Sequence, residues 1–222
     1  ISIALCTYNG SKYLAPQLAS FLEQTLLPDE VIVCDDFSTD ASIEILEEFA
    51  RDAPFPVRLH RNPRNLGVRA NFLQAIGLCQ GDFIALSDQD DIWLPHKLHR
   101  ARDRLRQCKN SESALYFSRL LYVDDHLEPL GMSPSKVKFG FSNAIVENVA
   151  TGCSVVFGTE IRRLLLQVPP QHMEMHDWWA YLVASAFGTV VYDNVPSILY
   201  RQHDANVAGW DPQALKILKR CN

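Results

Sequence analysis

The sequence lacks the long apolar run that a membrane-spanning helix needs. Such a helix requires about 20 consecutive apolar residues, and no stretch of the 222 residues approaches that length. The chain also has no excess of basic residues, because 21 Lys and Arg stand against 26 Asp and Glu for a formal net charge of −5. General binding to nucleic acid depends on cationic surface and is not expected. A small phosphate-bearing substrate held through a metal ion remains compatible with this charge.

Paired cysteine motifs are missing as well. The cysteines at positions 6, 34, 79, 108, 153 and 221 include no Cys-x-x-Cys pair, which argues against a zinc site or a redox dithiol. We expect buried, reduced thiols in a cytosolic protein. No basic segment precedes the apolar residues 1–5, so we expect no signal peptide. The start without Met, inside a predicted strand, suggests a trimmed sequence.

No linker, internal repeat or low-complexity tract divides the chain. In the first half, apolar runs at residues 2–6, 31–34 and 82–87 predict strands, residues 57–60 are predicted as a further strand, and apolar residues at helical spacing lie between them. Repeated strand–helix units of about 30 residues predict a parallel sheet with right-handed crossovers.

The second half is less regular. We expect helices over residues 94–108 and 178–187, strands over 114–123, 153–157, 189–192 and 198–201, and a polar loop over 124–140. The whole chain, residues 1–222, is predicted to be a single domain. Its first part, 1–92, would bind a nucleotide, and residues 93–222 would build the rest of the site.

Three carboxylates follow the fourth predicted strand directly. The sequence DQDD at residues 88–91 places Asp88, Asp90 and Asp91 within four positions, where they repel one another unless a cation is present. Mg²⁺ binds carboxylates together with phosphate oxygens, and ligands of open α/β sheets bind at the carboxyl ends of strands. The alternative is an acidic turn that caps the next helix, but a cap needs only one carboxylate.

Polar side chains also follow the first two predicted strands. The loop at residues 7–10 offers hydroxyl and amide groups that can bond a base or a ribose, although Asn-Gly also occurs in simple turns. After the second strand, Asp35 or Asp36 can accept hydrogen bonds from a pyrimidine or a ribose. The alternative is a helix cap, which Ser38 or Asp40 can supply without either of them.

The ordered set of these motifs resembles the nucleotide-sugar-binding half of the family 2 glycosyltransferases. The segments are IALCTYNG at 3–10, VCDDFSTD at 33–40, NLG at 65–67 and GDFIALSDQDD at 81–91. Later segments resemble the rhamnosyltransferase-like branch: TGC at 151–153, HDWW at 176–179 and YRQH at 200–203. The resemblance covers nearly the whole chain. It implies the GT-A fold, an α/β architecture with a Rossmann-like, mainly parallel central sheet flanked by helices and a smaller acceptor-side region.

The resemblance also implies a donor site and its residues. The nucleotide-sugar-binding residues would be Thr7, Tyr8, Asn9, Asp36, Asn65, Asp88 and Asp90. Asp88 would face the ribose or the metal, and Asp90 would bind a divalent ion, Mg²⁺ or Mn²⁺, that bridges the two phosphates. His203 would complete the metal site.

Asp177 would be the catalytic base in this resemblance. An inverting transfer needs a group that takes the proton of the acceptor hydroxyl as the hydroxyl attacks. His176, Trp178 and Trp179 would lie on the acceptor side, where the tryptophans can offer a flat apolar face to a sugar ring. The alternative for Asp177 is an N-cap of an apolar helix. The usual Glu-Asp pair of the family is His-Asp in this sequence.

The sequence is therefore interpreted as an inverting, metal-dependent glycosyltransferase. Its donor would be a dTDP- or UDP-sugar, with rhamnose favoured, and its acceptor a cell-surface polysaccharide or a lipid-linked glycan. Basic residues on the helix predicted at 94–109 indicate either a solvated face or contact with an anionic membrane. We accordingly expect a cytoplasmic protein that is peripheral at the inner face of the membrane.

Two other functions fit part of the pattern. A haloacid-dehalogenase-like phosphatase would use Asp88 as a covalent nucleophile, although motifs of that kind normally end the first strand rather than the fourth. A catalytically silent domain that binds a nucleotide sugar or a glycan is the second alternative.

Overall fold

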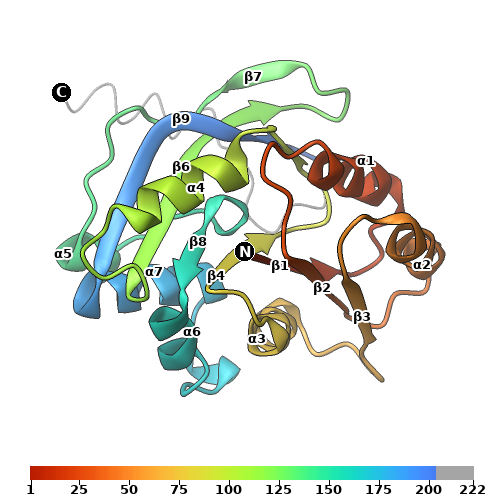
Figure 1. The fold of residues 1–222 in the computed structure, drawn as a ribbon, viewed down its shortest axis with the longest axis horizontal. Coiled ribbons are helices and arrows are strands. Elements are labelled where there is room, and N and C mark those ends of the chain that lie inside the picture. Colours follow the sequence, from red (N-terminus) through yellow and green to blue (C-terminus); the bar gives the residue numbers. More distant parts are fainter. Residues whose placement is uncertain (204–222) are drawn as a thin grey trace.

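The computed structural model describes residues 1–203 and confirms the predicted strand–helix alternation of the first half (Figure 1). Its elements are β1 (Ser2–Thr7), α1 (Ser11–Leu22), β2 (Glu30–Asp35), α2 (Ser42–Asp52), β3 (Val57–Arg61), α3 (Val68–Leu78) and β4 (Phe83–Ser87). β1 pairs with β2 and with β4, and β2 pairs with β3, in each case in parallel. The predicted parallel sheet is therefore present.

The second half extends the same sheet. Its elements are β5 (Ile92–Trp93), α4 (Lys97–Arg106), β6 (Ala114–Val123), β7 (Pro129–Met132), α5 (Phe141–Ala144), the 3₁₀ turn η1 (Gly152–Ser154), β8 (Val156–Gly158), α6 (Thr159–Leu165), the 3₁₀ turn η2 (Pro170–His172), α7 (His176–Phe187) and β9 (Thr189–Arg201). The strand order is β3-β2-β1-β4-β8-β6-β9-β5, with β7 beside β6. A single domain over 1–222 stays a prediction, because residues 204–222, including Cys221, lie outside the described part.

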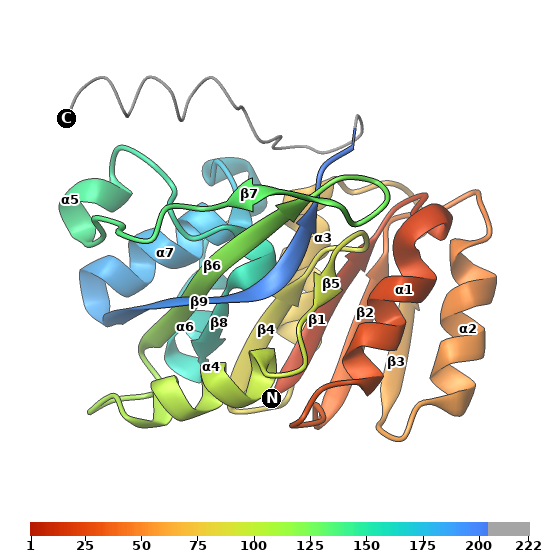
Figure 2. The ribbon, with the colours of Figure 1, turned by 90° about the horizontal axis from the view of Figure 1, so that it is seen from above.

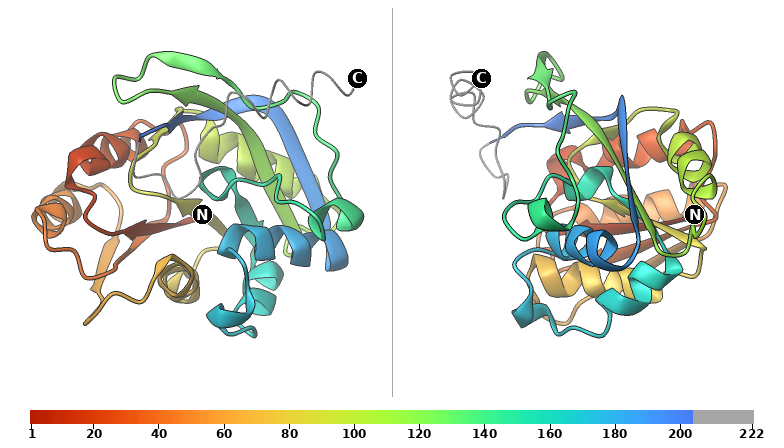
Figure 3. Two further views of the ribbon diagram at one scale, coloured as in Figure 1. Left: turned by 180° about the vertical axis from the view of Figure 1, so that it is seen from behind. Right: turned by 90° about the vertical axis from the view of Figure 1, so that its left-hand side faces the viewer.

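Helices cover both faces of this sheet (Figures 1 and 3). Alternate residues of a strand point to opposite faces. In β1, Ile3 and Leu5 pack into a core with α1, α2 and α4, while Ala4 and Cys6 pack into a second core with α3, α6 and α7. Burial on both faces explains why the first strands read as continuous apolar runs in the sequence.

Three details of the second half differ from the prediction. β9 is one strand from Thr189 to Arg201, where two short strands were expected. Residues 194–197 bulge between the pairs Ser118–Asp193 and Leu120–Ile198, and this polar, proline-bearing bulge looks like a break in the sequence. The predicted loop at 124–140 contains the exposed edge strand β7, and the strand predicted at 153–157 begins only at residue 156 because η1 precedes it.

The fold brings the ends of several parallel strands together at one edge of the sheet, where a site can form. The carboxyl ends of β1, β2 and β4 meet there, at the upper edge in Figure 2. Within residues 1–203, none of the helices combines the length and the apolar character required to cross a membrane.

Candidate functional site

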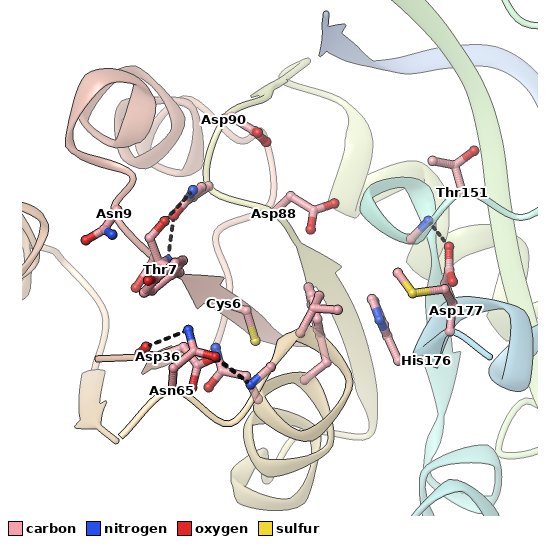
Figure 4. Close-up of a pocket in the computed structure, with 18 of the residues that line it drawn as sticks. Cys6, Thr7, Asn9, Asp36, Asn65, Asp88, Asp90, Thr151, His176 and Asp177 are labelled. Carbon is pink, nitrogen blue, oxygen red and sulfur yellow. Dashed lines mark hydrogen bonds between the residues drawn. The ribbon is translucent and has the colours of Figure 1, made fainter. Parts of the chain in front are cut away.

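A cavity of about 700 Å³ opens at this edge (Figure 4). The predicted site residues that line it are Thr7, Tyr8, Asn9, Asp36, Asn65, Asp88, Asp90, His176, Asp177 and His203. The sequence interpretation missed Cys6, Gly67, Val68, Asn71, Phe72, Gln89, Thr151, Gly152, Met175 and Tyr200 as lining residues. Trp178 and Trp179 are not among the lining residues, so their contact with an acceptor stays a prediction.

The loop after β1 is held by a residue of the acidic motif. Gln89 accepts a hydrogen bond from the Tyr8 backbone N–H at 2.8 Å and donates to the Tyr8 carbonyl at 3.1 Å. A Cβ on Gly10 would lie 2.2 Å from the Gln89 Oε1, so any other residue there would displace the Gln89 side chain. Gln89 therefore fixes the loop that was predicted to bind a nucleoside.

The ends of β1 and β2 are tied to each other. Thr7 donates its hydroxyl to Asp35 at 2.8 Å, and the Asn9 side chain accepts the backbone N–H of Thr39 at 2.9 Å. Asn9 and Phe37 have positive φ angles of 48° and 71°. Such angles are unfavourable for a residue with a bulky side chain and cluster at functional sites. The two loops form a rigid pair at the rim of the cavity.

Asp36 is already engaged by the turn before α3. Its carboxylate accepts the backbone N–H groups of Leu66 at 2.7 Å and Gly67 at 2.8 Å, and the Asn62 amide at 2.9 Å. The Asn65 amide donates to the Asp36 carbonyl at 3.3 Å. A carboxylate has about four acceptor positions, so little capacity remains for a base. Asp36 shapes the cavity wall, and its contact with a pyrimidine stays a prediction.

Two of the three predicted metal residues meet at the end of β4. The Asp90 carboxylate lies 2.9 Å from the His203 Nε2. Tyr13 of α1 stacks on His203 with ring centroids 4.7 Å apart, and the Arg201 guanidinium lies 4.8 Å from the centroid of the Tyr13 ring. Arg201 also donates to the Asp90 carbonyl at 2.9 Å. By contrast, no group within residues 1–203 hydrogen-bonds the partly exposed carboxylate of Asp88.

A buried cation accompanies the third acidic residue. Asp91 and Cys153 are fully buried, and one potential ligand atom from each lies within 4.8 Å of the other and of Asp88. Burial raises the pKa of the Asp91 carboxyl and of the Cys153 thiol well above their usual ranges. The buried Lys97 donates to the Cys153 carbonyl at 2.9 Å, and burial lowers the pKa of Lys97 to about 8 against the opposing charges of Cys153 and Asp91. A hard divalent ion prefers oxygen to a protonated thiol. Asp88 and Asp90 therefore fit such an ion better than Asp91 and Cys153.

Asp177 enters the cavity from the opposite side, at the first turn of α7. Its carboxylate accepts the Gly152 backbone N–H at 2.9 Å, the Asn148 amide at 3.0 Å and the Trp178 backbone N–H at 2.7 Å. Its charge is close enough to raise the pKa of Asp88, after the larger effects of burial and of Asp90. The two carboxylates therefore share one electrostatic environment across the cavity (Figure 4).

His176, the residue before Asp177, is 4% exposed. Its ring stacks on the ring of Phe72 with centroids 3.7 Å apart. Phe72 was not predicted as a site residue, because a single sequence does not show which core residue also borders a cavity. The following Trp178 donates its indole N–H to the Ala144 carbonyl at 2.7 Å, which directs it into the protein.

The predicted basic face of the helix at 94–109 is largely engaged within the protein. Lys97 is fully buried, Arg100 makes two hydrogen bonds of 2.9 Å to Asp193, and Arg102 bonds Asp103 at 3.0 Å. The remaining basic residues, Arg104, Arg106 and Lys109, are exposed.

Known proteins resemble this chain in sequence. The family model described as glycosyl transferase family 2 matches residues 2–117. A dTDP-rhamnosyl transferase of Shigella flexneri, RfbG, is 29% identical over 92% of this chain and 73% of its own length. A UDP-Glc-dependent β-1,3-glucosyltransferase of Escherichia coli, WfgD, is 28% identical over 70% of this chain and 58% of its own length. Several other curated relatives are matched over only about a third of their length.

Solved structures resemble it in fold. The structure of residues 1–349 of S. aureus TarS in complex with UDP-GlcNAc has a TM-score of 0.70 and 19% identity, and the match covers 99% of this chain and 64% of that chain. The same TarS fragment crystallised without a named ligand gives a TM-score of 0.67 over 90% of this chain and 60% of that chain. These similarities confirm the predicted GT-A fold.

Proposed function

The chain belongs to glycosyltransferase family 2, and on that premise we propose that it transfers one sugar from a nucleoside-diphosphate sugar to a glycan, with inversion at the anomeric carbon. We further propose dTDP-rhamnose as the donor, because RfbG, which is matched over 73% of its own length, is named a dTDP-rhamnosyl transferase. Membership of the family removes the phosphatase alternative. A silent binding domain would bind donor without consuming it.

One observation carries the proposal. The Asp88–Asp90 pair and Asp177 face one cavity from opposite sides, and the electrostatic effect of Asp177 reaches Asp88. An inverting transfer needs this arrangement, because the leaving diphosphate and the attacking hydroxyl lie on opposite faces of the anomeric carbon. The loops after β1 and β2 provide the remaining wall, where the nucleoside would lie.

A divalent ion, Mg²⁺ or Mn²⁺, fits the residues at the end of β4. Asp88 and Asp90 supply hard oxygen ligands, and His203 already contacts Asp90. Asp88 has no hydrogen-bond partner within residues 1–203, so its oxygens are available to such an ion. When bound, the ion supplies electrostatic stabilisation to the departing diphosphate.

Asp177 takes the proton. Hydrogen bonds from Gly152, Asn148 and Trp178 hold the carboxylate in one orientation at the cavity wall. The acceptor hydroxyl gives its proton to Asp177 while its oxygen bonds to the anomeric carbon, and the bond from that carbon to the diphosphate breaks. A positioned base of this kind accelerates transfer by about 10²–10⁴-fold.

We propose a cell-surface polysaccharide or a lipid-linked glycan as the acceptor, and a cytoplasmic location at the inner face of the membrane. Contact with an anionic membrane would rest on the exposed Arg104, Arg106 and Lys109 rather than on the whole basic series. Each such residue contributes about 1 kcal/mol near the surface. The double variant R106E/K109E should therefore lose binding to vesicles that contain anionic lipid. Unchanged binding would remove this contact.

The proposed activity is tested with a donor panel. Purified protein is incubated with dTDP-rhamnose, UDP-glucose or UDP-GlcNAc and a glycan acceptor, with Mn²⁺, Mg²⁺ or EDTA. With one of the donors, we expect metal-dependent release of the nucleoside diphosphate and formation of a new glycoside. NMR of the product should show an inverted anomeric configuration. Donor binding without release or transfer, for every donor and metal, would instead support the silent binding domain.

A further inference from the structure

The imidazole of His176 is buried without internal hydrogen-bond partners. Only 4% of the residue is exposed, and neither Nδ1 nor Nε2 has a hydrogen-bond partner within residues 1–203. Buried polar atoms are nearly always hydrogen-bonded in native proteins, and an unpaired one destabilises the fold. Two unpaired atoms on one ring therefore call for a functional reason.

The ring is held firmly in its place. It lies almost parallel to the ring of Phe72, with an interplanar angle of 11° and centroids 3.7 Å apart. Phe72 belongs to α3 of the nucleotide-binding half, whereas His176 begins α7 of the other half. The stack therefore joins the two halves at the cavity, where His176 lies next to Asp177 (Figure 4).

His176 and Asp177 both approach the backbone at Gly152 closely. A Cβ on Gly152 would lie 3.3 Å from the His176 Nε2 and 3.4 Å from the Asp177 Oδ2. Both atoms thus lie beside the same backbone position, and all three residues line the cavity. A hydroxyl group held by the imidazole would lie next to the carboxylate that takes the proton.

The chemistry of the ring favours a hydroxyl ligand. Burial lowers the pKa of His176, against the smaller opposing effect of Asp177. The neutral ring then offers one N–H donor and one nitrogen acceptor. A phosphate offers only acceptors at neutral pH, whereas a sugar hydroxyl both donates and accepts. The anionic diphosphate is also better placed near Asp88 and Asp90 with their metal ion than beside a neutral ring.

We propose that His176 determines donor specificity by hydrogen-bonding a hydroxyl group of the sugar that is transferred. The proposal rests on the proposed function, since it assumes a nucleotide sugar in this cavity. It adds that part of the affinity for the donor comes from a hydroxyl on the sugar itself and is independent of the nucleotide.

The test compares two variants of His176. His176→Phe keeps a flat ring on Phe72 and removes both nitrogens, and His176→Gln restores one donor and one acceptor. Calorimetry measures the Kd of dTDP-rhamnose and of dTDP, each with Mn²⁺. We expect His176→Phe to weaken dTDP-rhamnose about 5- to 20-fold, the range for one or two hydrogen bonds, and to leave dTDP within about twofold. His176→Gln should recover part of the loss.

A second measurement excludes a purely structural role. Because His176→Phe removes two unpaired buried atoms, its melting temperature should equal or exceed that of the wild type. Unchanged affinity for dTDP-rhamnose, equal losses for dTDP-rhamnose and dTDP, or a change only in the KM of the acceptor would each overturn the proposal. If the wild type binds neither dTDP-rhamnose nor dTDP, the two measurements are repeated with UDP-glucose and UDP. Absence of transfer with every donor would contradict the proposed function instead.

Discussion

The two walls of the cavity differ in how their polar groups are satisfied. On the nucleotide side, Asp36 accepts two backbone N–H groups and an amide, and Gln89 holds Tyr8 through two hydrogen bonds. On the side proposed for the reaction, Asp177 accepts three hydrogen bonds, but the Asp88 carboxylate and the His176 imidazole have no hydrogen-bond partner within residues 1–203. The hydrogen bonds of Asp36 and Gln89 are complete without a ligand, whereas Asp88 and His176 leave side-chain atoms that a ligand can engage.

This difference predicts that substitutions on the two sides of the cavity affect stability and activity differently. A substitution on the nucleotide side removes hydrogen bonds of the fold and should lower stability. Substitution of Asp88 or His176 removes polar groups that make no hydrogen bond within residues 1–203, so it should lower activity while stability is kept or improved. Such a trade between stability and function is common at active sites.

The largest effect is expected for Asp88→Asn. It removes a charge available to a divalent ion, and loss of stabilisation of the leaving group by about 3 kcal/mol or more lowers kcat/KM by at least about 100-fold. The free energy of unfolding without metal should not fall, because the carboxylate has no bond within residues 1–203 and suffers repulsion from Asp90 and Asp177. Transfer kinetics and urea denaturation measure the two quantities. A clear loss of stability would contradict the comparison.

Asp36→Asn should show the opposite pattern. An amide cannot accept all the hydrogen bonds that this carboxylate receives from Leu66, Gly67 and Asn62, and one leftover buried group costs about 1–3 kcal/mol. Urea denaturation should therefore report a destabilisation of that size. At temperatures where the variant is folded, kcat should fall less than in Asp88→Asn. A variant as stable as the wild type but inactive would assign Asp36 to the nucleotide rather than to the fold.

The pH dependence of stability sharpens the same contrast. Burial, together with the charges of Asp90 and Asp177, raises the pKa of Asp88 to about 8, against about 4 in the unfolded chain. Between these values the folded state binds the extra proton, so stability falls as pH rises. Without divalent ions, the wild type should lose stability relative to Asp88→Asn between pH 5 and pH 8. The loss is reduced by solvent screening, because Asp88 is partly exposed. A constant difference across this range would contradict the assignment.

The smallest effect is expected for Trp178→Phe. The change removes the indole bond to the Ala144 carbonyl and should cost about 0.5–1.5 kcal/mol of stability. The KM for the acceptor tests the predicted contact with a sugar ring. An increase in KM of about tenfold with unchanged kcat would support that contact, and a change below about twofold would leave Trp178 with a packing role.

The sequence predicted the parts of the site that local patterns encode. Asp36 and Asp88 were predicted because each follows a strand end, and Asp177 was predicted from the family resemblance. The structure places all three at one cavity, and their roles stay predictions. Phe72 and Gln89 were missed because their roles depend on contacts across the fold: Phe72 stacks on a residue 104 positions later (176 − 72), and Gln89 bonds one 81 positions earlier. The continuous strand β9 was missed because its bulge carries Pro196. Pairing with a distant strand overrode this local signal.

The most direct test of the account is Asp177→Asn under single-turnover conditions with saturating donor and Mn²⁺. We predict that the rate of sugar transfer falls about 10²–10⁴-fold, while the Kd of the nucleotide sugar stays within about twofold. Asparagine can still accept the Gly152 N–H and the Asn148 amide but not the Trp178 N–H, so a modest loss of stability is expected and both quantities are measured where the variant is folded. A transfer rate close to that of the wild type would contradict the account, because it would remove the base from the reaction side of the cavity.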